Sequence, residues 1–394
     1  MTPVFIFILV ILGLLIFTLV LVIYPLDQLY RWQTHDARHP AGKHFPFIRI
    51  LSRYRAKLTP TLRRQIAVGC ILIAVGTLLG TYLYLKWDLP RYADEPVTLS
   101  VTYTPERLAR GEYLAEHVAH CFVCHSPRQE DVFSLPVVAG QEGAGSSLPK
   151  EADYFPNHLY TPNLTPYHLS DWTDREIYRA ITQGVSKDGR ALHPVMPYAG
   201  FSRMQQSDVE AIIAYLRRLP SVENDIPTNQ LSPKEWIRAQ IATREADPFP
   251  AFSQQETVLR GEYLVTIAGC ALCHTPTDAY GRTGNDRFLA GGNVFTTPSG
   301  MRLRTPNLTP HASGLGNWSE QAFLNRFATY HDQEDLTPVE PGGFSTVMPW
   351  HAFANMEPED LSAIYDYLQT IPPVDHAFER IVEEPDQRMT TNSL

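Results

Sequence analysis

Two long apolar stretches near the amino terminus dominate the hydropathy pattern of the chain. Residues 5–24 and residues 66–85 each run for twenty positions without a charged side chain, and a helix of about twenty apolar residues can cross the hydrocarbon core of a bilayer. A cleaved signal peptide fits the first stretch poorly, because no basic residue precedes it and no small-residue cleavage site follows it. The pattern therefore predicts a two-helix transmembrane hairpin within residues 1–95.

The segment between the two stretches is basic. Residues 25–65 hold nine Lys and Arg against two Asp, and basic loops of membrane proteins stay in the cytoplasm. We therefore expect residues 90–394 in the periplasm of a bacterium, anchored to the inner membrane. Gly76 and Gly80 would allow another membrane helix to approach closely, although two glycines without a packing role fit the sequence equally well.

Beyond residue 95, apolar positions recur at helical spacing between long polar loops. Amphipathic helices are predicted at 208–219 and 359–371, the first from apolar residues at 209, 212, 213 and 216. Ser207 and Glu210 have the spacing of a capping box, and Pro358 suits the first turn of a helix. The predicted fold class is therefore mainly α.

These two helices close two matching halves of the chain. The pentapeptide Arg-Gly-Glu-Tyr-Leu occurs at 110–114 and 260–264, and Thr-Pro-Asn-Leu-Thr-Pro occurs at 161–166 and 305–310. The repeat predicts two related domains behind the hairpin. The expected segments are a first domain at 100–225, a linker at 226–253 with an amphipathic piece around Trp236, a second domain at 254–380 and a polar tail at 381–394.

Composition and charge exclude several classes of protein. With 44% apolar and 19% charged residues, the chain is not intrinsically disordered. Residues 91–394 carry 23 Lys and Arg against 39 Asp and Glu. Because nucleic-acid binding depends on Lys and Arg at the phosphates, this acidic body argues against a nucleic-acid partner.

Four of the five cysteines form two copies of the pattern Cys-x-x-Cys-His. This is the attachment signature of c-type haem, in which two thiols bind the haem vinyl groups and the adjacent histidine binds the iron. A four-thiolate zinc site, two redox pairs and two disulfides are the alternatives, and each leaves the paired histidines unexplained. We therefore predict two covalently attached haem c groups. The predicted haem-attaching cysteines are Cys121, Cys124, Cys270 and Cys273, and the predicted iron ligands beside them are His125 and His274.

The repeat also tests candidates for the second axial ligand, because a true ligand should occur in both halves. His193 aligns with Ser345, and His351 aligns with Ala199. Both histidines therefore fail as second ligands.

Two methionine pairs pass the same test. Met196 pairs with Met348, and Met204 pairs with Met356. We favour Met196 and Met348 because a proline that stiffens the loop follows each of them. Met204 and Met356 adjoin the start of the last helix, where core packing explains a methionine.

Each half resembles a class I cytochrome c domain, a family in which a glycine of an early helix packs against an aromatic residue of the last helix. Gly111 with Tyr215 and Gly261 with Tyr367 fit these positions. The sequences Cys-His-Thr-Pro at 273–276, Ala-Gly-Gly at 290–292 and the repeated hexapeptide resemble the cytochrome c subunits of membrane-bound alcohol, aldehyde and gluconate dehydrogenases. Those subunits usually carry three haem domains behind a signal peptide. The two-haem layout behind a hairpin is closer to the dihaem subunit of C-family haem–copper oxidases.

The resemblance implies electron relay within a respiratory complex, between a quinol or dehydrogenase side and a terminal oxidase. The expected partners are other membrane subunits, a redox partner protein and the membrane itself. We expect no catalytic site in this chain, because His/Met ligation fills both axial positions of an iron. A haem–copper oxidase subunit, a free-standing membrane-bound shuttle and a dihaem peroxidase are the alternatives.

Overall fold

The computed structural model describes residues 59–88, 98–148, 159–243, 246–253, 255–277, 285–331 and 337–382. The predicted membrane span at 5–24, most of the basic loop and most of the polar tail lie outside these residues. The chain divides into two units, residues 1–88 and residues 89–394. Both predicted cytochrome domains fall within the second unit.

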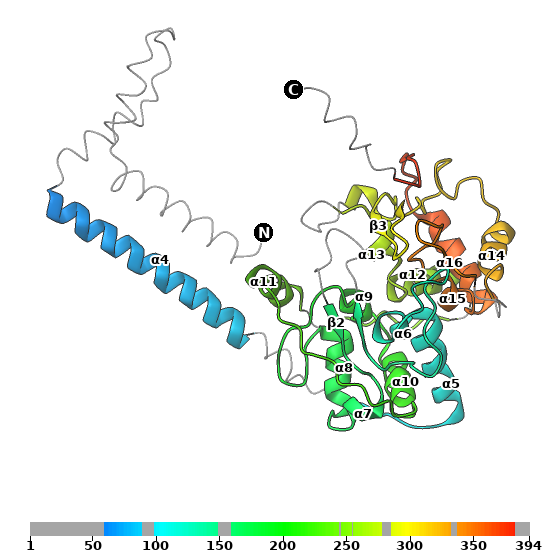
Figure 1. Ribbon diagram of the computed structural model, residues 1–394, viewed down its shortest axis with the longest axis horizontal. Coiled ribbons are helices and arrows are strands. Elements are labelled where there is room, and N and C mark those ends of the chain that lie inside the picture. Colours follow the sequence, from blue (N-terminus) through cyan, green and yellow to red (C-terminus); the bar gives the residue numbers. More distant parts are fainter. Residues whose placement is uncertain are drawn as a thin grey trace, which may run out of the picture. The chain divides into compact units, whose positions relative to one another are not determined.

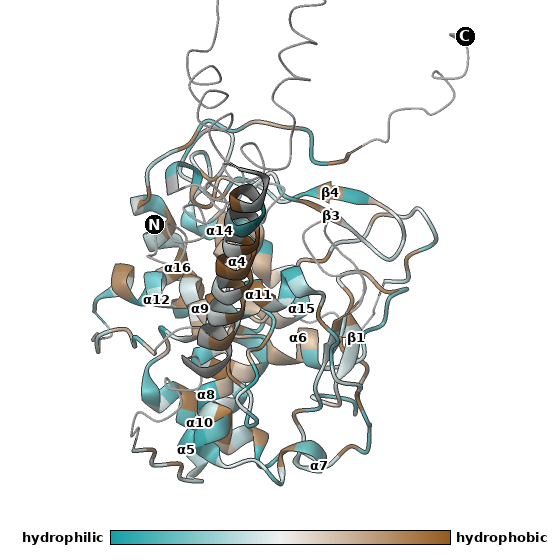
Figure 2. Cartoon of the chain, turned by 90° about the vertical axis from the view of Figure 1, so that its left-hand side faces the viewer, coloured by the Kyte–Doolittle hydropathy of each residue, from teal (hydrophilic) through white to brown (hydrophobic). Residues whose placement is uncertain are grey.

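The described part of the first unit is the helix α4, Pro60–Asp88 (Figure 1). Its apolar side chains are exposed, including Leu72 at 65% and Leu78 at 66%, and the helix is brown along much of its length in Figure 2. Within the described ranges, no helix is both long enough and apolar enough to cross a membrane. The described residues therefore leave the predicted transmembrane hairpin unsupported.

The second unit is built mainly of helices, as the sequence predicts. Its longer helices pair in the same way in each half, α5 (Pro105–Tyr113) with α10 (Gln206–Leu216) and α12 (Thr257–Ile267) with α16 (Pro358–Thr370) (Figure 1). A π-helical turn, η3 (Leu114–Val118), extends α5. The remaining helical elements are α6 (Cys121–His125), α7 (Pro166–Leu169), α8 (Asp174–Gln183), α9 (Tyr198–Phe201), α11 (Pro233–Ala242), α13 (Cys270–His274), η4 (Asn285–Arg287), α14 (Glu320–Ala328) and α15 (Trp350–Phe353).

Sheet structure in the described residues is limited to two short antiparallel pairs. Strand β1, Ser146–Leu148, pairs with β2, Leu159–Thr161, and β3, Val294–Thr296, pairs with β4, Arg302–Arg304. Each pair follows a Cys-x-x-Cys-His helix in the chain. The pairs therefore brace the loops that follow these helices.

A glycine is required where each helix pair crosses. A Cβ atom added at Gly111 would lie 2.0 Å from the carbonyl oxygen of Ala211 and 2.9 Å from Cβ of Tyr215. At Gly261 the same atom would lie 1.9 Å from the oxygen of Ala363. Because both separations are far below van der Waals contact, only glycine allows the helices this close. The packing of Gly111 against Tyr215 is the one that the family resemblance predicts.

The helix-start predictions have mixed outcomes. Pro358 lies in the first turn of α16, as predicted. The capping box at Ser207 is wrong, because α10 begins one residue earlier without a side-chain cap. The Glu210 carboxylate instead accepts hydrogen bonds from the Ser100 N–H at 2.9 Å and from Arg107 at 2.7 Å. A long-range ion pair therefore takes the place of the predicted local bond.

The two halves of the second unit are joined by reciprocal contacts. Tyr263 in the second half donates its hydroxyl proton to Asp208 in the first at 2.6 Å, and Tyr113 in the first half donates to Asp360 in the second, also at 2.6 Å. Within each half the same aspartate is paired with an arginine. The pairs are Arg110 with Asp208 at 2.8 Å and Arg260 with Asp360 at 2.5 Å. Both aspartates are buried, so each half completes the buried charge network of the other.

Candidate haem sites

The first Cys-x-x-Cys-His motif forms the short helix α6. Cys121 and Cys124 are half-buried and not joined by a disulfide, whereas His125 is buried. The His125 Nδ1 lies 2.8 Å from the carbonyl oxygen of Pro162. Because a carbonyl oxygen only accepts, Nδ1 carries the proton in this bond. Nε2 is therefore the nitrogen left with a free lone pair for a metal.

The second motif repeats this arrangement in α13. His274 is buried, and its Nδ1 donates to the carbonyl oxygen of Pro306 at 2.9 Å. Pro162 and Pro306 occupy the same place in the two Thr-Pro-Asn-Leu-Thr-Pro segments. In both halves the repeated hexapeptide therefore supplies a proline carbonyl that orients the motif histidine. Sequence reasoning identified the repeat without assigning it this contact.

Each hexapeptide is itself fixed by its asparagine. Asn163 donates to the carbonyl of Val222 at 2.8 Å, and Asn307 donates to the carbonyl of Val374 at 2.9 Å. Both acceptors lie in the segment that follows the last helix of their half. The asparagines therefore tie the hexapeptide, with its proline carbonyl, to that segment.

Burial favours the neutral forms of the motif side chains by shifting their pKa values. It lowers the pKa of His125, and it lowers the pKa of His274 to about 4. The same cause raises the pKa of the Cys121 and Cys270 thiols to about 12. Neutral imidazole is the form that binds a metal, so both histidines are suited to ligate iron at neutral pH.

The alternatives to haem find no support in this geometry. Among the residues that the structure describes, no disulfide joins the four motif cysteines. In the described ranges, no three His, Cys, Asp or Glu side chains gather in a way that suits a metal ion. The residues present fit a c-type haem better, because each motif offers two thiols and an oriented, neutral imidazole.

The two methionine pairs occupy different environments. Met204 and Met356 are buried in the hydrophobic core, with exposed fractions of 1% and 4%. Met196 and Met348 are half-buried and pack at the edge of that core. Each lies two residues before a one-turn helix, α9 or α15. The pair chosen from the sequence is therefore the more accessible one.

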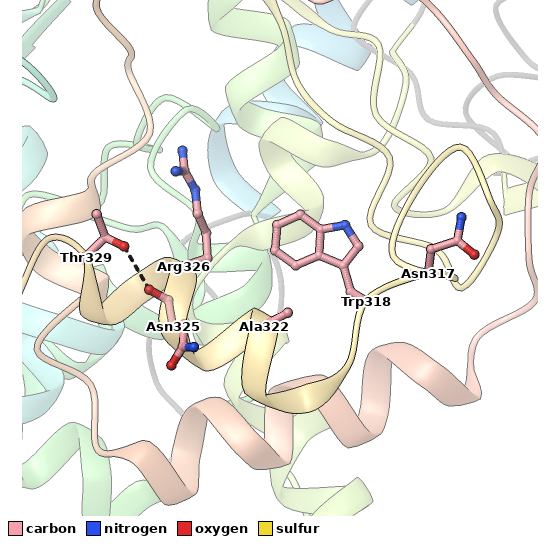
Figure 3. Close-up of a pocket in the computed structure, with 6 residues that line it drawn as sticks. All are labelled: Asn317, Trp318, Ala322, Asn325, Arg326 and Thr329. Atoms are coloured by element: carbon pink, nitrogen blue, oxygen red, sulfur yellow. Dashed lines mark hydrogen bonds between the residues drawn. The ribbon is translucent and has the colours of Figure 1, made fainter.

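Each hexapeptide is followed in the chain by a tryptophan, Trp172 or Trp318, and the two do not share an environment. Trp172 is half-buried, with the Lys187 ammonium over its ring at 5.6 Å. Trp318 is 39% exposed and lines a pocket of about 390 Å³ beside α14, together with Arg326 (Figure 3). The Arg326 guanidinium also lies over the ring of Trp350 at 4.9 Å. This pocket wall therefore reaches the loop that carries Met348.

Comparison with known proteins agrees with these observations. No family model matches the chain. The alcohol dehydrogenase (quinone) cytochrome c subunit of Gluconacetobacter polyoxogenes is 30% identical over 286 residues, which cover 67% of this chain and 56% of that protein. A diheme cytochrome c-type protein of Cereibacter sphaeroides is 24% identical over 336 residues, which cover 80% of this chain and 100% of that protein. The chain is similar to cytochrome c subunits.

Other relatives extend this similarity to further dehydrogenases. The fructose dehydrogenase cytochrome subunit of Gluconobacter japonicus is 28% identical over 313 residues, which cover 75% of this chain and 59% of that protein. The chain thus spans somewhat over half the length of these dehydrogenase subunits. The resemblance seen in the sequence is confirmed. Together with the two motifs, the similarity supports covalently bound haem c, with its iron, as the cofactor.

Proposed function

We propose that the chain is a dihaem c-type cytochrome that relays electrons as a subunit of a membrane-bound dehydrogenase or respiratory complex. The observation that carries this proposal is the repeated bond from Nδ1 of the motif histidine to a proline carbonyl, at 2.8 Å for His125 and 2.9 Å for His274. It orients both imidazoles for ligation in the same way. The domain boundaries we propose are 100–225 and 254–380, joined by the linker 226–253.

The proposed iron ligands are His125 with Met196 and His274 with Met348. The accessibility of these two methionines supports the choice, because Met204 is enclosed by core side chains. When bound, each haem supplies one-electron chemistry between ferric and ferrous iron. The protein contributes the ligands and the burial that set the potential. With both axial positions filled, electron transfer is favoured over substrate binding.

The names of the relatives support a dehydrogenase as the electron donor, since they are cytochrome subunits of alcohol, fructose and gluconate dehydrogenases. A quinol is the alternative donor in this proposal, and a terminal oxidase would accept the electrons. Membrane subunits of the complex and a soluble redox protein are the proposed partners.

Membrane attachment belongs to the same proposal. The predicted span 66–85 lies within α4, where Ile71, Leu72, Ile73 and Leu78 are each more than half exposed. A contiguous exposed apolar surface of this kind is unfavourable in water and suits lipid or an apolar partner helix. We propose that it forms a hairpin with residues 5–24 and holds the haem domains in the periplasm.

The haem assignment is tested by counting haem per chain. We expect two covalent haems in the wild type, one after Cys121→Ser with Cys124→Ser, and none after Cys270→Ser and Cys273→Ser are added. Haem staining of a denaturing gel and the pyridine haemochrome spectrum measure this. Cys70→Ser is the control and should retain both haems. Haem that survives all four substitutions would reject the assignment.

The ligand assignment is tested by spectroscopy of methionine variants. Met196→Ala and Met348→Ala should each remove one methionine-to-iron charge-transfer band and lower one midpoint potential. Met204→Leu and Met356→Leu preserve volume in the core and should leave both bands. The opposite pattern would move the ligand to the core pair.

The membrane arrangement is tested with a reporter that is active only in the cytoplasm. It should be active when inserted near Gly42 and inactive when fused after Leu394. Activity at Leu394 would contradict the proposed orientation.

A further inference from the structure

A loop of the first half contacts the second half at the segment around Met348. The segments around Met348 and Met196 are here named the methionine loops. Residues 129–135, here named the clamp loop, follow the first haem motif in the chain. The Phe133 N–H donates to the carbonyl of Thr337 at 2.9 Å, and the Val339 N–H donates to the carbonyl of Asp131 at 2.7 Å. Val132 and Pro338 form an antiparallel bridge between these bonds. The clamp loop is thus fixed to the segment leading to Met348.

The tip of the clamp loop holds the methionine loop directly. The Ser134 hydroxyl donates to the carbonyl oxygen of Met348 at 2.8 Å and accepts the Trp350 N–H at 2.9 Å. The His351 Nε2 donates to the carbonyl of Phe133 at 3.1 Å. Ser134 therefore bridges the residues on either side of Pro349, which itself has no N–H to donate.

The backbone at this tip is strained in a way that the contacts maintain. Ser134 has φ +64° and Leu135 has φ +52°, the left-handed region that non-glycine residues rarely adopt. Both are buried, with exposed fractions of 4% and 3%. Two consecutive residues remain in this conformation only where the surrounding structure fixes them.

Aromatic packing reinforces the polar contacts. The ring of Phe133 stacks on Tyr330 with a centroid distance of 5.7 Å, and Tyr330 stacks on Trp350 at 4.8 Å. The clamp loop therefore reaches the residue after Pro349 by two routes, one through the Ser134 hydroxyl and one through stacked rings.

The corresponding loop of the first half is held differently. The Met196 carbonyl accepts the Tyr198 N–H at 2.8 Å, and the Met348 carbonyl accepts the Trp350 N–H at the same distance. Of these two methionine carbonyls, only that of Met348 accepts an additional hydrogen bond from the other half within the described residues. The repeat is thus broken at one of its two methionine loops.

We propose that Ser134 is a positioning residue that holds Met348 in its ligating position, so that the first haem domain controls the axial ligand of the second haem. The inference rests on the proposed function, because it takes Met348 to be an iron ligand. Loss of the hydroxyl shifts the methionine loop toward an open form without altering Met196. An external ligand then competes more easily for the second iron only.

Imidazole binding to the ferric dihaem protein measures this opening, because the apparent affinity scales with the fraction of open loop. Ser134→Ala should raise the imidazole affinity at one haem by roughly 2- to 10-fold, the range for loss of one net hydrogen bond. The affinity at the other haem should not change. In the same variant the midpoint potential of the affected haem should fall, since methionine ligation raises it.

Two further variants separate the hydroxyl from other effects. Ser134→Gly relieves the backbone strain and also lacks the hydroxyl, so it should give the same shift as Ser134→Ala. Thr182→Val is the control, because it removes a buried hydroxyl that donates to the carbonyl of Tyr178 at 2.8 Å within α8. It should change neither imidazole affinity. A shift in Ser134→Ala but not in Ser134→Gly would overturn the proposal, as would an equal shift at both haems.

Met348→Ala separates this inference from the proposed function. If it leaves both charge-transfer bands intact, the ligand assignment itself has failed. If it removes one band while Ser134→Ala changes neither affinity nor potential, the ligand assignment stands and the positioning role of Ser134 is rejected.

Discussion

Replacing Tyr263 by phenylalanine tests the reciprocal contacts that join the two halves. The substitution removes the hydroxyl that donates to Asp208 at 2.6 Å and accepts the Gln205 N–H at 3.3 Å. Hydrogen bonds to charged groups contribute about 1.5–3 kcal/mol. Arg110 still bonds both oxygens of the aspartate, at 3.0 and 2.8 Å, so no buried charge is left unpaired. We therefore expect a loss at the lower end of that range, about 1.5–2 kcal/mol.

The reciprocal variant should lose more. Tyr113→Phe removes the matching bond to Asp360, which retains its ion pair with Arg260 at 2.5 Å. Because the ion-paired Oδ1 of Asp360 is buried and accepts no hydrogen bond, the loss should lie at the upper end of the range, about 2–3 kcal/mol. Urea unfolding of the haem-loaded chain in detergent measures both values, provided that the denaturant dependence of the unfolding free energy stays unchanged.

Tyr365→Phe is the matched control for these measurements. It removes a bond of similar length, 2.7 Å, but the acceptor is the neutral Trp318 carbonyl within the same half and the site is exposed. We expect a loss below about 0.5 kcal/mol, since an exposed neutral bond exchanges with water. If Tyr263→Phe and Tyr113→Phe cost no more than this control, the reciprocal contacts do not join the halves as argued.

Three further outcomes follow from the structure. Gly111→Ala should lower the unfolding free energy by at least about 2 kcal/mol, because the added Cβ would lie 2.0 Å from the Ala211 oxygen. Gly189→Ala is the control: this glycine lies in open space at φ +79°, so the substitution should cost only about 1 kcal/mol of backbone strain. Burial lowers the pKa of His117 below 6.5 in the folded chain, so this side chain binds fewer protons in the folded state than in the unfolded state at acid pH. The unfolding free energy should fall as pH drops below 6.5, and it should fall less steeply in His117→Gln, by at most about 1.4 kcal/mol per pH unit for this one group. Electron transfer to a basic redox protein should slow as salt rises, because residues 91–394 carry 23 basic against 39 acidic residues; a rate independent of ionic strength in stopped-flow mixing would contradict this.

The sequence could predict the features that are local or repeated. Each Cys-x-x-Cys-His motif can be recognised from five consecutive residues. The repeat distinguishes Met196 and Met348, which match each other, from His193 and His351, which have no histidine counterpart. The close helix crossing at Gly111 follows from the family resemblance. The mainly α fold follows from helical spacing of apolar residues, and α10 and α16 occur within a few residues of their predicted positions.

Long-range contacts account for what the sequence could not predict. Ser134 bonds Met348 across 214 residues, and no spacing rule connects positions so far apart. His351, excluded as an iron ligand by the repeat, instead bonds the clamp loop. Glu210 has the spacing of a local cap, but α10 already includes Ser207, and the Glu210 carboxylate pairs with Arg107, which lies 103 residues earlier.

The reciprocal pairing of the two halves has the form of a symmetric dimer contained in one chain. In a two-fold interface the same patch occurs on both partners. If residue i of one partner contacts residue j of the other, then residue j of the first also contacts residue i of the second. Tyr113 with Asp360 and Tyr263 with Asp208 obey this rule, and each half therefore holds both members of the pair. An isolated first half would present Tyr113 together with Asp208 on one surface. Such a fragment would therefore carry both members of the tyrosine–aspartate contact that a two-fold dimer of it would use.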